Sequence, residues 1–311
     1  MHRVVLRRVA ALAITLPLTA AVVFFLTSVL PGDVARRILG REATQEAVDA
    51  KNAALGLDRP LWQQFADWAG GFLRGDWGTS FTKGEPVRGL VLAHLGRSLV
   101  LGGAAFLILV PLSVGLGLLA GFRHGTRTDR VINVGGLIGT ATPEFVSGVV
   151  LLIVFTVQLH WLPVSARPEH GPAGLVLPIA CLLIATTGYV SRMVRSSVVT
   201  TLEQPYVRTA RLKGLTTNEL VRRHVLRNSL LVPITALGVQ LRYVVGGLVT
   251  VELLFNYGGI GSLLLEAARD KDVPTLQAAT LVAGAFIMVT FLITDLLYMW
   301  IDPRVRIGQQ R

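Results

Sequence analysis

Residues 98–122 read SLVLGGAAFLILVPLSVGLGLLAGF, a run of 25 positions without a charged side chain. An α-helix needs about 20 apolar residues to cross the hydrocarbon core of a bilayer, which is roughly 30 Å thick. The run is therefore predicted to be a membrane-spanning helix. The rest of the 311-residue chain agrees, because 52% of its residues are hydrophobic and only 16% are charged, which is unusual for a soluble domain.

Six runs have the length of a span and carry at most one charged group each. They are residues 9–30, 98–122, 131–159, 173–191, 228–251 and 273–301. The strands of a membrane barrel would alternate between a lipid face and a lumen face over about 10 residues, whereas these runs are apolar on all sides. We therefore predict an all-α integral membrane protein with six transmembrane helices.

The first run resembles a secretory signal peptide, because a basic start precedes it. Its apolar part of 22 residues is longer than the apolar core of such a signal, and no small-residue cleavage site follows. Residues 1–30 are therefore expected to remain as an N-terminal transmembrane helix.

The distribution of Lys and Arg predicts the orientation, because short loops rich in these residues stay on the cytoplasmic side. With the N-terminus inside, the inner segments hold 17 of the 30 basic residues, and the two short outer loops hold Arg167, Arg269 and Lys271. The first outer segment, residues 31–92, is long enough to escape the rule. Both termini are therefore predicted to be cytoplasmic in the cell (plasma or inner) membrane. The net charge of +11 fits contact with anionic lipid or a cytosolic partner and requires no nucleic acid.

The outer segment 31–92 has helical patterns of its own. In ATQEAVDAKNAALGLDRPLWQQFADWAGG, a polar helix that begins after a Thr is followed by a turn and a second helix. The second helix places Trp62, Phe65, Trp68 and Phe72 at helical spacing. This aromatic stripe is expected either to lie on the outer membrane surface or to face a docking protein.

The most basic inner loop lies between the fourth and fifth spans and reads EQPYVRTARLKGLTTNELVRRHVLRN over residues 203–228. Pro205 suits the first turn of a helix, and Gly214 suits the left-handed position that ends one. Thr216 and Glu219 have the spacing of a capping box, which predicts a second helix through residues 220–228. Such a loop is either a basic surface with its charges in water or a docking site for a partner.

This loop resembles the cytoplasmic signature loop of binding-protein-dependent ABC transporter permeases, which reads Glu-Ala-Ala, three residues, Gly. Arg208, Thr209 and Ala210 stand at the first three positions and Gly214 at the last, a variant typical of the dipeptide, oligopeptide and nickel branch. The similarity continues in ATPEFVSGVVLLIVFTVQLHWLPVS, VVGGLVTVELLFNYGGIGSLLLEA and TDLLYMWIDPRVR. It covers nearly the whole chain in order, and the chain looks like the first of two permease subunits. Gly258 departs from the pattern, because the family often has Pro there.

The resemblance implies an ABC importer type I permease fold. Its core would be residues 93–302, with a cytoplasmic tail at 303–311. The implied partners are a second permease subunit, two cytosolic ABC ATPase subunits, an extracytoplasmic solute-binding protein and membrane lipid. A helix from Tyr206 to Lys213 would seat in a cleft of the ATPase. Its small Ala210 would permit close approach, and Gly214 would form the corner. The residues assigned to this ATPase-coupling loop are Tyr206, Arg208, Thr209, Ala210, Lys213 and Gly214.

No phosphate-binding motif G-x-x-x-x-G-K-[ST] occurs in the chain, so the energy of ATP is expected to come from another subunit. No catalytic residue and no cofactor are predicted. The single cysteine, Cys181, lies in the fourth apolar run, and neither a disulfide nor a cysteine-based metal site is expected.

Charged residues inside the spans are the other candidates for function, because each is costly in a membrane and is expected to face protein or water. Glu144, Arg242 and Asp295 are the candidates for lining a pathway. Pro143 precedes Glu144 and is expected to open the backbone near the middle of the third span. Glu144 then either meets the ammonium group of a peptide or pairs with Arg242, and Asp295 is expected to be structural.

Several functions stay open at this point. Within the family, the cargo is a di- or oligopeptide, nickel or glutathione. An ion-coupled secondary transporter would use Glu144 and Asp295 to relay protons, although no clear inverted repeat supports it. An intramembrane hydrolase or a simple membrane anchor are further alternatives, and no hydrolase motif occurs in the chain.

Overall fold

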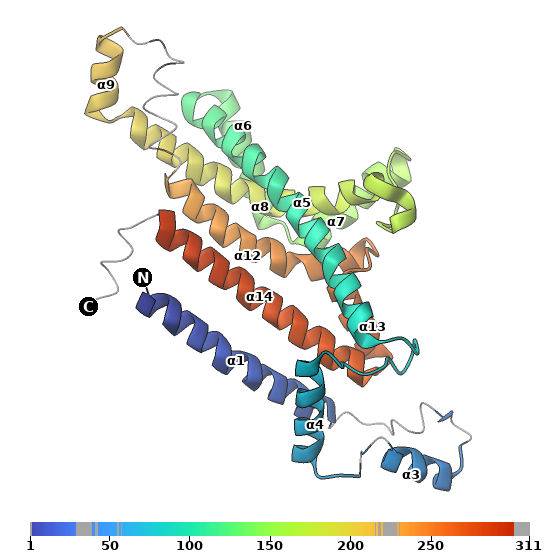
Figure 1. The fold of residues 1–311 in the computed structure, drawn as a ribbon. Coiled ribbons are helices and arrows are strands. Elements are labelled where there is room, and N and C mark those ends of the chain that lie inside the picture. Colours follow the sequence, from blue (N-terminus) through green and yellow to red (C-terminus); the bar gives the residue numbers. More distant parts are fainter. Residues whose placement is uncertain are drawn as a thin grey trace. The chain divides into compact units, whose positions relative to one another are not determined.

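The computed structural model describes residues 2–28, 39–40, 43–54, 56, 58–214, 216, 219, 229 and 231–301. Within them the chain is almost entirely helical, and the only β-structure in these ranges is an isolated bridge between Thr79 and Pro86 (Figure 1). The helices in chain order are α1 (His2–Ser28), α3 (Gln45–Ala54), α4 (Leu61–Arg74), α5 (Val87–Phe122), α6 (Arg127–Ala141), α7 (Glu144–Leu151), the π-helix η1 (Leu152–Gln158), the 3-10 turn η2 (Pro168–His170), α8 (Gly171–Leu202), α9 (Pro205–Leu212), α12 (Leu231–Leu254), α13 (Ile260–Arg269) and α14 (Val273–Ile301). The all-α prediction is confirmed.

Five of these helices are long and apolar enough to cross a membrane, and a sixth span results if α6 and α7 with η1 count as one bent pair. This agrees with the six predicted runs. The third run is broken where Pro143 predicts it, because α6 ends at Ala141, α7 begins at Glu144, and the two halves are bent by 108°. Two helices extend well past their predicted ends: α5 begins at Val87 rather than 98, and α8 continues to Leu202 rather than 191.

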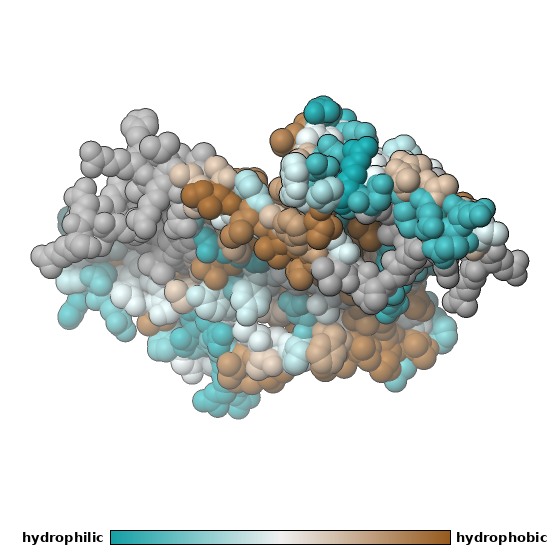
Figure 2. All heavy atoms as spheres, turned by 90° about the horizontal axis from the view of Figure 1, so that it is seen from below, coloured by the Kyte–Doolittle hydropathy of each residue, from teal (hydrophilic) through white to brown (hydrophobic). Residues whose placement is uncertain are grey.

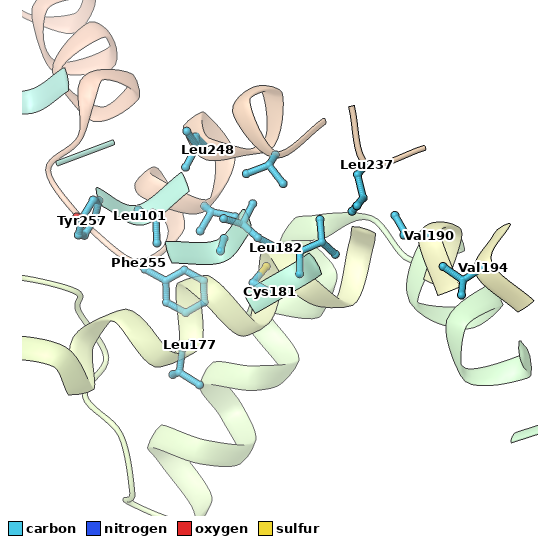
Figure 3. Packing of buried hydrophobic residues seen from close by; sticks show 14 of the residues in the cluster. Leu101, Leu177, Cys181, Leu182, Val190, Val194, Leu237, Leu248, Phe255 and Tyr257 are labelled. Atoms are coloured by element: carbon cyan, nitrogen blue, oxygen red, sulfur yellow. The ribbon is translucent and has the colours of Figure 1, made fainter. Parts of the chain in front are cut away.

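The described residues divide into two compact units, one of residues 97–262 and 289–301 and the other of residues 2–96 and 263–288. In the first unit, α8 is the central helix, and α6, α7 and α12 all pack against it. An apolar cluster built mainly from α5, α8 and α12 forms the core of this unit. Its largest members include Leu101, Leu182, Leu248 and Phe255, and Cys181 is also fully buried there (Figure 3).

Glycines allow the helices of this unit to approach closely. A Cβ atom on Gly188 of α8 would overlap the carbonyl oxygen of Gly136 of α6, and one on Gly117 of α5 would lie 2.6 Å from the carbonyl oxygen of Ser191. Small residues at helix contacts are typical of membrane proteins, in which van der Waals packing replaces the hydrophobic effect as the source of association.

In the second unit, α4, which belongs to the segment predicted to lie outside, packs against the end of α1. Phe24 and Phe25 of α1 lie 5.4–5.8 Å, between ring centroids, from Phe65 and Trp68 of α4. Most of the aromatic stripe therefore packs against other residues of the same chain. Trp62 remains 66% exposed on the same helix.

Residues 79–86 form a hairpin within the segment predicted to lie outside, here called the outer hairpin, and the start of α14 holds it. The buried carboxylate of Asp272 accepts hydrogen bonds from the hydroxyl groups of Ser80, Thr82 and Thr275 and from the backbone N–H of Phe81. This arrangement satisfies a buried charge with donors from two separate segments.

Many large hydrophobic side chains of the spanning helices are exposed on the chain taken alone. Leu18 of α1, Leu107 of α5 and Phe145 of α7 are examples. Figure 2 shows hydrophobic side chains on the face that it presents, next to hydrophilic ones. Exposed apolar surface of this extent is expected of helices that face lipid or another subunit.

Candidate functional site

The predicted coupling helix is present as α9, which follows α8 after a short break at residues 203–204. Gly214 has a φ of +82° and open space around it, as expected for the residue that ends this helix. The capping box is also present: the Thr216 N–H donates to the Glu219 carboxylate at 3.1 Å, and the Glu219 N–H lies 3.4 Å from the Thr216 hydroxyl. The predicted second helix, at 220–228, lies outside the described residues.

The structure shows which face of α9 the described residues leave exposed. Val207 and Ala210 are buried in the apolar cluster, whereas Leu212 is 82% exposed. The inward direction of Ala210 differs from the expected role, in which its small side chain faces the ATPase cleft. It instead seats α9 on its own chain. The predicted residues with an exposed position are Tyr206, Arg208, Thr209, Lys213 and Gly214. Leu212 was not among the predicted site residues. It could have been found, because it is an apolar residue that does not share the helix face of Val207 and Ala210.

An ion pair with a buried carboxylate holds the end of α8 that is predicted to be cytoplasmic, and its two residues were not among the predicted site residues. Asp129 lies just before the third predicted span, and Arg195 lies just after the end predicted for the fourth. Arg195 donates to both carboxylate oxygens of Asp129, through Nε to Oδ1 and through Nη2 to Oδ2 at 2.7 Å. The Gly125 N–H adds a bond of 3.0 Å. The Arg195 guanidinium, against the opposing effect of burial and with help from Gly125, holds the pKa of Asp129 well below its usual range.

The charged residues inside the spans form a different pair from the one considered above. Arg242 of α12 donates to Asp295 of α14 at 2.6 Å, and its guanidinium lies 4.7 Å from the ring centroid of Phe291. The alternative in which Arg242 pairs with Glu144 is therefore not what the structure shows. Asp295 is held in an ion pair, which agrees with the expected structural role.

Glu144 lies at the first turn of α7, immediately after the break at Pro143. Its carboxylate rests against α12, where a Cβ atom on Gly247 would lie 2.6 Å from Oε1. An open hollow of about 490 Å³ lies between the two helices. It is lined by Glu144, Val239, Arg242, Tyr243, Gly246 and Gly247. The structure thus brings Glu144 and Arg242 to one hollow.

Comparison with known proteins identifies the family. The model of the family described as binding-protein-dependent transport system inner membrane component matches residues 113–307, and the model of its N-terminal part matches residues 1–101. The chain belongs to this family of transport permeases.

The permease has similar relatives over nearly its full length. It is 33% identical to a probable peptide ABC transporter permease protein of Sinorhizobium fredii, over 97% of this chain and 98% of the relative. It is 34% identical to a putative peptide permease protein of Brucella ovis, over 99% and 98%. It is also 33% identical to the glutathione transport system permease protein GsiC of Salmonella typhi, over 97% and 98%.

A solved structure has the same fold. A chain of the MetNI methionine ABC transporter, in an inward-facing conformation, aligns with a TM-score of 0.55 and 16% identity, over 70% of the permease and 99% of that chain. The permease therefore has the type I fold of ABC importers. It is a multi-pass membrane protein and an ABC permease of the peptide and glutathione family.

The backbone conformation at Gly258 accounts for the departure from the family pattern at this position. This residue has a φ of +72°, which proline cannot adopt because its ring holds φ near −65°. The turn that contains it is held by Glu252, which is fully buried and accepts hydrogen bonds from the Ser98 hydroxyl and, at 2.8 Å, from the Gly261 N–H at the start of α13. Glu252 therefore has a structural role at this turn.

Proposed function

We propose that this permease forms one half of the translocation pathway of an ATP-driven importer of di- or oligopeptides. The relatives with 32–34% identity over almost the whole chain support this cargo, because most of them are named as peptide permeases. Glutathione is the second candidate cargo, since the permease GsiC is equally similar.

The exposed face of α9 is the proposed contact with the ATPase. Arg208, Thr209, Leu212 and Lys213 point away from the chain next to the Gly214 corner, and a short helix with a free face can seat in a groove of a partner. The observation that carries this proposal is the inward seating of Val207 and Ala210, because none of the described residues then covers Leu212 and Lys213 on the other side of the helix.

The proposed assembly contains a second permease subunit, two cytosolic ABC ATPases and an outer solute-binding protein. Hydrolysis of ATP takes place on the ATPase subunits, since the permease sequence has no phosphate-binding motif. Residues 31–92 lie outside, both termini lie inside, and residues 93–302 form the core, with the tail at 303–311. The Lys and Arg distribution supports this orientation.

An ion-coupled transporter is less well supported. Such a mechanism would use Asp295 as a proton relay, but Arg242 and Asp295 form an ion pair of 2.6 Å. The carboxylate of Asp295 is thus held by a group of its own chain, which agrees with a structural role for this residue.

The test is reconstitution in liposomes with and without the other subunits. The purified permease alone is expected to hydrolyse no ATP, and the complete assembly is expected to import peptide only when ATP and the binding protein are present. Hydrolysis by the permease alone, or uptake driven by a proton gradient without ATPase subunits, would refute the proposal.

A further inference from the structure

The hollow between α7 and α12 lies at mid-height of a span. Val239, Tyr243 and Gly247 follow one face of α12 at helical spacing, and they occupy the middle of this helix, Leu231–Leu254. Substrate sites of membrane transporters commonly lie near the middle of the bilayer, where broken helices meet. The break at Pro143 places Glu144 at this level.

Glu144 is the acidic group of the hollow, and the acidic and basic groups of the neighbouring pair are matched. Arg242 is neutralised by Asp295, and its guanidinium also lies over the ring of Phe291. Within the described residues, no hydrogen bond or ion pair reaches the carboxylate of Glu144. Among the described residues, the carboxyl group of Glu144 is therefore the acidic group of the hollow that has no polar partner.

Two features of α12 make room for a ligand at this carboxylate. Gly246 leaves open space, because a Cβ atom there would meet no atom within 4 Å, and Gly247 leaves room for the Glu144 carboxylate itself, both of whose oxygens would lie within 3 Å of a Cβ atom at that position. Tyr243 is 63% exposed beside them and offers an aromatic face. A carboxylate next to an aromatic ring attracts a cation, and both groups suit an ammonium.

We propose that Glu144, with Tyr243, binds the free ammonium group of the cargo during its passage. This inference rests on the proposed function and specifies the chemical class that the hollow accepts, a primary ammonium. In this proposal Glu144 contacts the cargo, and Gly247 positions the Glu144 side chain.

The experiment separates charge from shape at this position. Glu144→Asp keeps the charge but shortens the side chain, Glu144→Gln keeps the shape but removes the charge, and Glu144→Lys reverses the charge. Each variant is reconstituted with its partner subunits, and uptake of trialanine and of glutathione, which both carry a free ammonium, is measured together with ATP hydrolysis. Glu169→Gln, on an exposed carboxylate of the outer loop, is the matched control.

The expected order of maximal uptake is wild type and Glu144→Asp first, then Glu144→Gln about tenfold lower, as expected from the loss of a contact to a charged group, and Glu144→Lys lowest. KM is expected to stay unchanged, because delivery by the binding protein sets it, and cargo moved per ATP hydrolysed is expected to fall in the same order. The control is expected to match the wild type.

Two results would overturn the inference while the proposed function stands. One is wild-type uptake by Glu144→Gln with a slower Glu144→Asp, since that order reports shape. The other is an equal loss of uptake, ATP hydrolysis and thermal stability in Glu144→Gln, since that reports folding. If the wild type imports neither cargo with ATP, the proposed function fails and the inference fails with it.

Discussion

Two neighbouring glycines of α6 show how single residues set the distance between helices. A Cβ atom on Gly136 would lie 2.9 Å from Cα of Gly188, whereas one on Gly135 would meet no atom within 4 Å. Gly136→Ala is therefore expected to force α6 and α8 apart and to cost about 1–3 kcal/mol of stability. Gly135→Ala is the control and is expected to be neutral or to stabilise the helix by about 0.5–1 kcal/mol.

The measurement is thermal unfolding in detergent with a thiol-reactive dye. Cys181 is the only cysteine of the chain and is fully buried, so its labelling reports loss of the core. Equal melting temperatures for the two variants would contradict the close contact between α6 and α8.

Gly214 allows a test of the coupling loop without a steric clash. Its φ of +82° is strained for any residue with a Cβ atom, but the space around it is open. Gly214→Val is expected to cost about 1–3 kcal/mol in the conformation that ends α9, enough to lower the docked population roughly tenfold. Uptake is expected to fall while the amount of permease in the membrane stays normal.

Gly84→Val is the control for this strain, because Gly84 has a φ of +68°, also has open space, and lies in the outer hairpin. Ala210→Glu is expected to unseat α9 from its apolar cluster and to reduce ATPase binding as well. Normal uptake and normal ATPase binding in both loop variants would make the loop a solvated surface rather than a coupling element.

The Asp129–Arg195 pair predicts a dependence of stability on pH. Asp129→Asn leaves the Arg195 guanidinium without its charged partner and is expected to cost about 1–3 kcal/mol. Because the pKa of Asp129 is lowered by folding, its contribution is complete above the unfolded value near 4 and is lost as pH falls toward the folded value. The difference in melting temperature between variant and wild type is expected to be constant from pH 8 to 5 and to narrow below about pH 4.

His124 is a second group that contacts this carboxylate, because its Nδ1 lies 3.4 Å from Asp129 Oδ2. His124→Gln removes that group, and the narrowing is expected to persist in this background. A difference that instead changes between pH 6 and 7, and disappears with His124→Gln, would assign the effect to the imidazole.

Residue-level features with a local cause could be predicted from the sequence. The positive φ of Gly214 and the Thr216–Glu219 capping box follow from positions a few residues apart. The partner of Arg242 and the inward direction of Ala210 depend on the rotation of whole helices against each other, which no local pattern specifies.

Among the elements, α4 bears on whether the aromatic stripe lies on the membrane surface or faces a docking protein. Phe65 and Trp68 pack on α1, while Trp62 and Leu73 stay exposed on a neighbouring face of α4. Because α4 packs at the end of a spanning helix, on the side predicted to be outside, these two side chains are expected to enter the lipid surface. The Arg59–Asp67 ion pair occupies a polar face.

Spin labels distinguish the two faces of α4. A label on Leu73→Cys is expected to be more accessible to oxygen, which is soluble in lipid, and a label on Asp67→Cys to a water-soluble nickel chelate. If both labels contact the chelate, and the label at position 73 is protected only when the solute-binding protein is added, the exposed face is a docking site for that protein.

The boundaries of elements were harder to predict than their number. Hydropathy marks the edge of the lipid, whereas a helix ends where its backbone hydrogen bonds end, so α5 and α8 continue past their apolar runs. The break in the third span was predictable because Pro143 lacks a backbone donor and restricts the residue before it.

The whole molecule is a subunit whose exposed apolar helices need lipid or a partner, as its family membership implies. Its fold class could be predicted from composition and run length, because only helices and closed barrels satisfy the backbone in a bilayer, and runs that are apolar on all sides do not fit barrel strands. The orientation in the membrane follows only from the Lys and Arg distribution and is the property to be measured.

Topology is tested with single cysteines and a membrane-impermeant maleimide. The cells keep their cytoplasmic membrane intact, and any barrier outside that membrane is opened so that the reagent can reach it. Thr79→Cys, exposed in the outer hairpin, is expected to react, and Lys213→Cys, exposed after α9, is expected to react only after the membrane is permeabilised. The buried native Cys181 is expected to give no signal in either condition and serves as the background control. The permease is expressed without its ATPases, so that a docked partner does not protect position 213. Reaction of Lys213→Cys from outside together with protection of Thr79→Cys would invert the orientation, and the coupling loop would then face away from any cytosolic ATPase.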